Sequence, residues 1–149
     1  MDSFQVFFER FNKNDDAKPI KQLDIDKIEN EFVINLPNDY KDFIKRFGDT
    51  WTPGILDIIV DSEKELNDIQ QIWTIDQIIY DKKNEWTSQL YVDIIPFASD
   101  CMGNIFGFIT SDLKKENVES PVYFFDHDFD TVEKICESFT ELIDKYIEL

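Results

Sequence analysis

LPNDYKDFIKRFG, residues 36–48, has the pattern of an amphipathic helix with a marked start and a marked end. Pro37 suits the first turn of a helix, because the N–H that proline lacks would be unpaired there in any residue. Gly48 suits a helix end, because glycine readily takes the left-handed conformation that closes many helices. Four apolar side chains between them recur at the i, i+3, i+4, i+7 spacing that lines one helix face: Tyr40, Phe43, Ile44 and Phe47. The stretch therefore predicts a helix with one buried face.

Two further helices are predicted upstream of this one. The first is expected over residues 3–13, where Ser3 marks the start. Phenylalanines recur there at helical spacing: Phe4, Phe7, Phe8 and Phe11. A second helix is expected to start at Asp24, which suits the N-cap because its carboxylate can accept a hydrogen bond from an amide of the first turn. The apolar face of this second helix consists of Ile25, Ile28 and Phe32.

A strand and a fourth helix are predicted after Gly48. Residues 55–60 have the β-branched composition of a short strand. Ser62 and Glu65 have the spacing of a capping box, in which the two side chains bond the free amides at a helix start. A helical segment is therefore expected from Ser62 to about residues 82–84.

The rest of the chain predicts strands followed by one helix. Three segments are rich in β-branched and aromatic residues, which favours strands at residues 90–97, 104–109 and 122–125. The first two are expected to be joined by a turn at residues 100–104, which contains Gly103. A last helix is expected behind the capping pair Asp130 and Glu133. Its predicted apolar face consists of Val132, Ile135, Cys136, Phe139, Leu142, Ile143 and Tyr146.

This order of elements predicts the α+β class, with a mainly antiparallel sheet flanked by N-terminal helices, a middle helix and a C-terminal helix. No stretch rich in Gly, Pro or Ser offers a linker, so residues 1–149 are predicted to form a single domain. The start of the chain lacks the basic and apolar segments of a signal peptide, and no apolar run has a membrane helix's length. We therefore expect a cytoplasmic protein in which Cys101 and Cys136 are reduced thiols, although one disulfide between them is possible.

The helix pair around residues 36–48 resembles the opening of the SUKH superfamily, which includes fungal cell-wall regulators and bacterial immunity proteins. The matching residues are Ile25, Glu29, Leu36, Pro37, Tyr40, Phe43, Ile44 and Gly48. Further matches follow in the family's order: Pro96-Phe97-Ala98, Gly103-Asn104, residues 122–128 and Ser138-Phe139. At two positions the chain departs from the family, with Val33 in place of a glycine and Phe47 in place of an asparagine. The resemblance covers about residues 24–147 and implies a single SUKH-like domain.

The net charge is −17, from 32 acidic and 15 basic residues. Most of this excess follows residue 60: residues 1–60 hold 12 acids and 8 bases, whereas residues 61–149 hold 20 acids and 7 bases. Such a chain is not expected to bind DNA or RNA, because affinity for phosphates comes from Lys and Arg. The charge instead favours a cationic partner, although it is also compatible with a role in solubility alone.

The sequence offers little support for catalysis. Its one histidine, His127, excludes a His-rich metal site, and no common hydrolase, zinc-site or phosphate-loop motif occurs. Asp126, Asp128 and Asp130, with Glu137 at the twelfth position, approach the spacing of a calcium loop, but Thr131 stands where the sharp turn needs glycine. We therefore expect no enzyme activity, metal or cofactor. A glycoside-hydrolysing pair of carboxylates is still possible, because the sequence does not show how far apart two carboxylates lie in the fold.

Two kinds of residue are candidates for contact with a partner. Tryptophan is common at interface hot spots, which favours the loop residues Trp51 and Trp86 over Trp73, which is expected in the core. Acids in turns can pair with a basic surface. The predicted contact residues are Trp51, Trp86, Asp100, Asp126, Asp128 and Asp130.

The resemblance and the charge together predict a non-enzymatic immunity protein that neutralises a cognate bacterial toxin. The toxin is expected to be a nuclease, since nucleases present Lys and Arg to phosphates and an acidic protein can cover that surface. A regulatory adaptor that binds a cellular protein is the alternative, and a carboxylate-based hydrolase is a third hypothesis.

Overall fold

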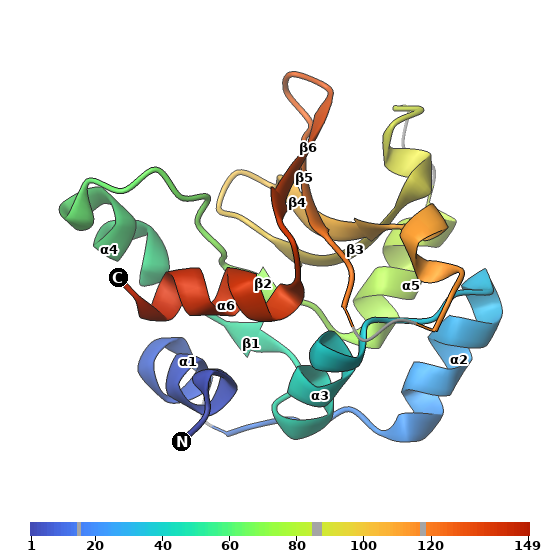
Figure 1. Cartoon of the computed structure of the whole chain (residues 1–149), viewed down its shortest axis with the longest axis horizontal. Coiled ribbons are helices and arrows are strands. Elements are labelled where there is room, and N and C mark those ends of the chain that lie inside the picture. Colours follow the sequence, from blue (N-terminus) through green and yellow to red (C-terminus); the bar gives the residue numbers. More distant parts are fainter. Residues whose placement is uncertain (15, 85–87, 117–118) are drawn as a thin grey trace.

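The computed structural model describes residues 1–14, 16–84, 88–116 and 119–149. Its centre is a six-stranded antiparallel sheet, whose strands lie side by side in chain order from β1 to β6 (Figure 1). These strands are β1 (Thr50–Trp51), β2 (Gln71–Ile72), β3 (Ile94–Ser99), β4 (Ile105–Ile109), β5 (Val122–Asp126) and β6 (Thr131–Cys136). The predicted α+β class and the strands at residues 104–109 and 122–125 are confirmed, to within a residue at each end.

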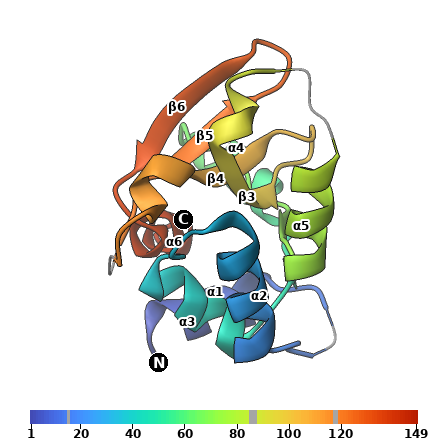
Figure 2. The ribbon, with the colours of Figure 1, turned by 90° about the vertical axis from the view of Figure 1, so that its right-hand side faces the viewer.

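Six α-helices surround the sheet within the described ranges: α1 (Ser3–Phe11), α2 (Gln22–Phe32), α3 (Asn38–Arg46), α4 (Ile55–Ser62), α5 (Ile75–Lys83) and α6 (Phe139–Ile147). Helices α1 and α3 pack against α6, and α2 packs against α5. Figure 2 shows α1, α2 and α3 together on one side, below the sheet, so that the N-terminal helices form a layer of their own. None of the helices in the described part of the chain has the length and apolar character needed to cross a membrane.

Aromatic rings from the helices and the sheet form the centre of the core. Phe139 of α6 contacts Phe43 of α3 and Phe97 of β3 edge-on, with ring centroids 5.5 Å apart in both pairs. Tyr40 packs against Phe97 and Phe108 at 5.4 Å. Each such pair adds roughly 0.5–1.5 kcal/mol to the stability given by burial alone. The stripe predicted on residues 36–48 is therefore the surface through which α3 meets the sheet and α6.

A side-chain contact explains how the chain turns between α2 and α3. The Glu29 carboxylate accepts a hydrogen bond from the Leu36 amide at 2.8 Å and lies 3.5 Å from the Lys41 ammonium. Val33 ends α2 in the left-handed conformation, with φ of 53°. The position at which family members often have glycine is thus left-handed in this chain, although a β-branched side chain is strained in that region.

Gly48 ends α3 where two segments of backbone come close. Its φ is +70°, and a Cβ added there would lie 1.7 Å from the carbonyl oxygen of Lys18. Lys18 and Gly48 form a parallel β-bridge, and the Lys18 amide also bonds the Phe47 carbonyl at 2.9 Å. Only glycine fits, because any side chain would collide with this backbone.

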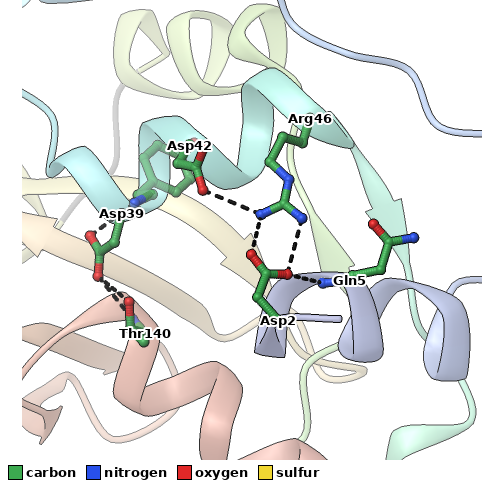
Figure 3. A network of polar contacts seen from close by, with 7 residues as sticks. Asp2, Gln5, Asp39, Asp42, Arg46 and Thr140 are labelled. Atoms are coloured by element: carbon green, nitrogen blue, oxygen red, sulfur yellow. Dashed lines mark hydrogen bonds and ion pairs between the residues drawn. The ribbon is translucent and has the colours of Figure 1, made fainter.

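Polar contacts on the surface join α3 to two other helices (Figure 3). The Arg46 guanidinium forms two hydrogen bonds with the Asp2 carboxylate, at 2.7 and 3.0 Å, and a third with Asp42 at 3.3 Å. Asp2 is also the N-cap of α1, and Arg46 lowers the pKa of its carboxyl to about 2. Asp39 accepts two hydrogen bonds from Thr140 in the first turn of α6, each at 2.9 Å.

Helix starts differ slightly from their predicted positions. Helix α2 begins at Gln22, so Asp24 lies in its first turn and Lys21 occupies the cap position. Helix α3 begins at Asn38, with Pro37 at the cap instead of inside the first turn. The strand predicted from residue 90 begins at Ile94, after a 3₁₀ turn at Tyr91–Asp93.

The strand predicted at residues 55–60 is wrong, because this segment is helix α4. Ile55 and Ile59, four residues apart, are both buried, as one helix face requires. The capping box predicted at Ser62 is also wrong, because α4 ends there and residues 63–70 have no regular structure. The next helix, α5, starts with the capping box of Thr74 and Gln77.

The start predicted for the last helix is wrong as well. Residues from Thr131 to Cys136 form strand β6, which pairs with β5 through contacts such as Val132 with Phe125. Asp130 is a turn residue with φ of 52° instead of part of a cap. Helix α6 begins at Phe139, where the Ser138 hydroxyl accepts a hydrogen bond from the Glu141 amide at 3.0 Å.

Candidate protein-binding surface

Asp100 organises the turn between β3 and β4. One oxygen of its carboxylate, Oδ1, accepts hydrogen bonds from the amides of Met102 and Asn104, at 2.9 and 2.8 Å. Gly103 supplies the positive φ of 82° that closes the turn. This turn confirms the one predicted at residues 100–104 and fixes Asp100 at the end of the sheet.

Asp126 plays the same part in the turn between β5 and β6. Its Oδ1 accepts hydrogen bonds from the amides of Asp128 and Phe129, at 2.9 and 3.2 Å. Asp130 then takes the left-handed conformation and accepts a hydrogen bond from the Ser88 hydroxyl. Asp128 and Asp130 themselves are exposed to solvent. Figure 1 shows that this hairpin projects beyond the rest of the sheet at the top of the molecule.

Asn104 and His127 join the two turns to each other. The Asn104 side-chain oxygen accepts a hydrogen bond from the His127 amide at 3.2 Å, and its Nδ2 donates to Asp100 Oδ2 at 3.0 Å. The His127 ring contributes a second link, with Nε2 at 2.8 Å from the Met102 carbonyl oxygen. Because a carbonyl only accepts, Nε2 carries the proton in this contact. Four predicted contact residues therefore belong to one connected unit, called here the acidic turns: Asp100, Asp126, Asp128 and Asp130.

The charges of the acidic turns act on the neighbouring ionisable groups. The pKa of His127 lies above its ordinary value, chiefly because of its hydrogen bond to Met102, and further because of the carboxylates of Asp128, Asp126 and Asp100. Asp68, from the loop after α4, accepts a hydrogen bond from the Cys101 amide at 3.2 Å. Partial burial, and then Asp100, raise the pKa of Asp68. The carboxylates at this end of the sheet therefore add to the effect of the Met102 hydrogen bond on His127 and to the effect of burial on Asp68.

Two apolar side chains in the acidic turns were missed by sequence reasoning. The side chain of Phe129 is 78% exposed and that of Met102 is 66% exposed. The sequence does contain a signal for Phe129, because a phenylalanine between acids at the tip of a turn has no core to enter and must be exposed. Exposed aromatic and methionine side chains are typical of protein-binding surfaces.

The SMI1/KNR4 family (SUKH-1) matches residues 19–145. The chain belongs to this family. The match includes every motif that carried the predicted resemblance, from the helix pair around Leu36 and Pro37 to Ser138 and Phe139. Members of the SMI1/KNR4 family are generally non-enzymatic immunity or regulatory proteins, so membership supports a protein-binding role. No curated protein sequence matches the chain.

Trp51 lies at the opposite edge of the sheet from the β5–β6 turn in this SMI1/KNR4 domain. Trp51 lies on β1, four strands from β5, which corresponds to roughly 19 Å at about 4.8 Å per strand. It is closer to the β3–β4 turn, because it pairs with Gln71, which pairs with Ser99, so only two strand spacings, roughly 10 Å, separate it from the residue before Asp100. It is 40% exposed, and its amide and carbonyl bond the segment that follows α1, through Asn12 and Lys13. Trp86 lies outside the described residues. Trp73, predicted to lie in the core, is only partly buried, and its indole N–H donates a hydrogen bond to the Ser99 hydroxyl.

The calcium-like spacing does not form a loop in this SMI1/KNR4 domain. Strand β6 begins at Thr131, so Glu137 lies about 20 Å further along, at roughly 3.3 Å per residue. A strand, instead of the expected helix, therefore separates Glu137 from the aspartates. Among the residues that the structure describes, no three His, Cys, Asp or Glu side chains are grouped so as to hold a metal ion.

Proposed function

We propose that this protein is a cytoplasmic, non-enzymatic immunity protein that binds a cognate toxin, a basic nuclease, and neutralises it by covering its nucleic-acid-binding surface. The observation that supports this proposal is that hydrogen bonds of Asn104 and His127 join the turn that holds Asp100 to the turn that holds Asp126, Asp128 and Asp130. Family membership supports a protein-binding role, and the net charge of −17 supports a basic partner.

The mechanism follows from what a nuclease must present. Its substrate groove carries Lys and Arg to neutralise phosphates, so a carboxylate surface can occupy that groove in place of the nucleic acid. Long-range attraction brings the two proteins together quickly. The turns are held by their own hydrogen bonds, so little conformational entropy is lost when a partner orders them.

Growth rescue and association kinetics with the toxin encoded beside this gene test the proposal. Co-expression should protect cells from that toxin. The association rate should fall roughly tenfold or more between low and high salt, because salt screens the charges that steer the encounter. No protection and no binding would overturn the proposal. Binding to a cellular protein without any toxin would instead favour the regulatory adaptor.

Paired variants identify the surface. Asp126→Asn with Asp128→Asn removes two charges but keeps the turn, because asparagine can accept the same amide hydrogen bonds. This variant should associate more slowly. Asp57→Asn with Asp61→Asn removes two exposed charges from α4 and is the matched control for overall charge. Equal slowing in both variants would contradict a role for the acidic turns in particular.

A further inference from the structure

A groove of about 410 Å³ lies beside the β5–β6 turn, on the face of the sheet turned toward the loop after α4. This volume suits a long side chain or a small molecule. Its walls come from the loop, the two strands and their turn. The lining residues are Asn67, Phe124, Asp126, Phe129, Thr131 and Glu133.

The register of the hairpin brings these side chains to one face. Phe124 is paired with Glu133, and Asp126 is paired with Thr131, so both pairs share the same side of the strands. The Phe124 ring is held edge-on by Phe106, with centroids 5.2 Å apart. The Phe124 wall of the groove is therefore in place before any ligand binds.

The loop on the other side of the groove is also fixed. The Tyr146 hydroxyl, buried in α6, donates a hydrogen bond to the Asn67 carbonyl at 2.6 Å. This contact holds the loop against the helix at Asn67, which also lines the groove. The spacing between the loop and the hairpin is thus set by the core.

The groove combines aromatic rings with two carboxylates, and the ionisable nitrogen base next to Asp126 is the His127 ring, whose pKa Asp126 helps to raise. Neither Asp126 nor Glu133 forms an ion pair within the described ranges. Lys134, which follows Glu133 in the chain, pairs with Glu137 at 2.7 Å. A cation over a phenyl ring and next to a carboxylate gains both cation–π and charge-assisted hydrogen-bond energy.

We propose that this groove binds an arginine side chain of the basic partner. This proposal rests on the proposed function and specifies where one residue of the partner would bind. The guanidinium is planar, so it stacks on Phe124 or Phe129 while its edge donates two hydrogen bonds to Glu133 or Asp126. A lysine ammonium is a compact, strongly hydrated charge and matches this geometry less well. The groove thus selects arginine within a surface that attracts any cation.

Titration of the full-length protein with N-acetyl-arginine amide, followed by backbone amide NMR signals, tests the groove directly. Shifts should be confined to residues 67 and 124–133 and should saturate at millimolar concentrations, as expected for one side chain. N-acetyl-lysine amide should bind several-fold more weakly, and N-acetyl-citrulline amide, the uncharged analogue, should produce no such shifts. Equal shifts with citrulline, or arginine shifts elsewhere only, would overturn the proposal.

Two variants and two controls sharpen the result. Phe129→Ala and Glu133→Gln should each weaken arginine binding by about tenfold. Neither should unfold the domain, because both side chains are exposed. Leu23→Ala, at an exposed position on α2, and Glu116→Gln, in a separate hollow beside Asn35, should bind like the wild type. Wild-type binding by both groove variants would refute the assignment.

The same variants separate this proposal from the proposed function. If the toxin binds the wild type and both groove variants equally well, the groove assignment fails and the immunity function stands. If N-acetyl-arginine amide binds in the groove but the toxin does not bind the protein, the groove stands and the immunity function fails.

Discussion

The side chain of Asn104 holds the backbone of His127, and through this contact the β3–β4 turn is fixed to the β5–β6 turn. Asn104 is only 8% exposed, and its amide also bonds Asp100. Asn104→Ala removes both hydrogen bonds and leaves their partners partly buried, so the free energy of unfolding should fall by about 2 kcal/mol. Chemical denaturation measures this loss.

Asn30→Ala is the control for Asn104→Ala, because Asn30 is exposed on α2. Its effect should stay within about 0.5 kcal/mol. The Asn104 variant should also associate more slowly with the toxin, since its acids are no longer held in one unit. Unchanged stability in Asn104→Ala would mean that the turns are held together by other contacts.

The pKa of His127 makes stability depend on pH in a definite direction. The pKa is raised above the ordinary value of 6.5 in the folded protein, so protonation favours folding. This contribution is complete below about pH 6.5 and is lost as pH rises through the raised pKa. The free energy of unfolding should therefore decrease between about pH 6 and pH 8, and it should do so less in His127→Asn.

An NMR titration of the His127 ring checks this pKa directly. Asp128→Asn removes the carboxylate that lies 3.4 Å from Nδ1, so it should shift the pKa of His127 back toward the ordinary value. Asp57→Asn, on α4, should leave the titration unchanged. A His127 pKa at or below 6.5 in the wild type would contradict the structural account.

The helix with signals at both of its ends could be predicted from the sequence, whereas the capping pairs at Ser62 and Asp130 and two short apolar runs gave wrong predictions. The Pro37 and Gly48 signals bracket α3 correctly to within about a turn. Residues 55–60 and 131–136 are short β-branched runs that fit both the helix and the strand period. Burial of Ile55 with Ile59 decides the first, and pairing of β6 with β5 decides the second. Burial and strand pairing both depend on tertiary contacts, which the local sequence pattern does not show.

The acids of the candidate surface could also be predicted, but not their arrangement. Asp100 and Asp126 lie in turns, where short polar side chains bond nearby amides. Their connection depends on Asn104, which precedes β4, reaching His127, which follows the neighbouring strand β5. The groove depends on Asn67 being held by Tyr146, 79 residues away in the chain. Such distant contacts have no signature in spacing.

Val33 offers a test of backbone strain. A β-branched residue at φ of 53° costs roughly 1–2 kcal/mol, and 74% exposure means that its side chain contributes little burial. Val33→Gly should therefore raise the free energy of unfolding by about 1 kcal/mol, after allowing for the greater freedom of glycine in the unfolded chain. Thermal and chemical denaturation measure this gain.

Val33→Ala gives the graded comparison. Alanine keeps the Cβ but loses the branch, so its stabilisation should be smaller than that of glycine. If both substitutions destabilise the protein, the Val33 side chain makes a favourable contact that outweighs its backbone strain.

Tyr146 and Tyr40 form a matched pair of buried hydroxyls with opposite expectations. The Tyr146 hydroxyl donates to the Asn67 carbonyl at 2.6 Å, whereas the Tyr40 hydroxyl has no hydrogen-bond partner among the described residues. Tyr146→Phe should lower the free energy of unfolding by about 1–2 kcal/mol, because it leaves a carbonyl without its bond. Tyr40→Phe should be neutral or stabilising, because it removes an unsatisfied buried group.

Chemical denaturation of both variants measures the difference in their free energies of unfolding. Amide hydrogen exchange near Asn67 should accelerate only in Tyr146→Phe, since only that variant releases the loop. Equal losses of stability in the two variants would show that the Tyr40 hydroxyl does have a partner, such as a buried water.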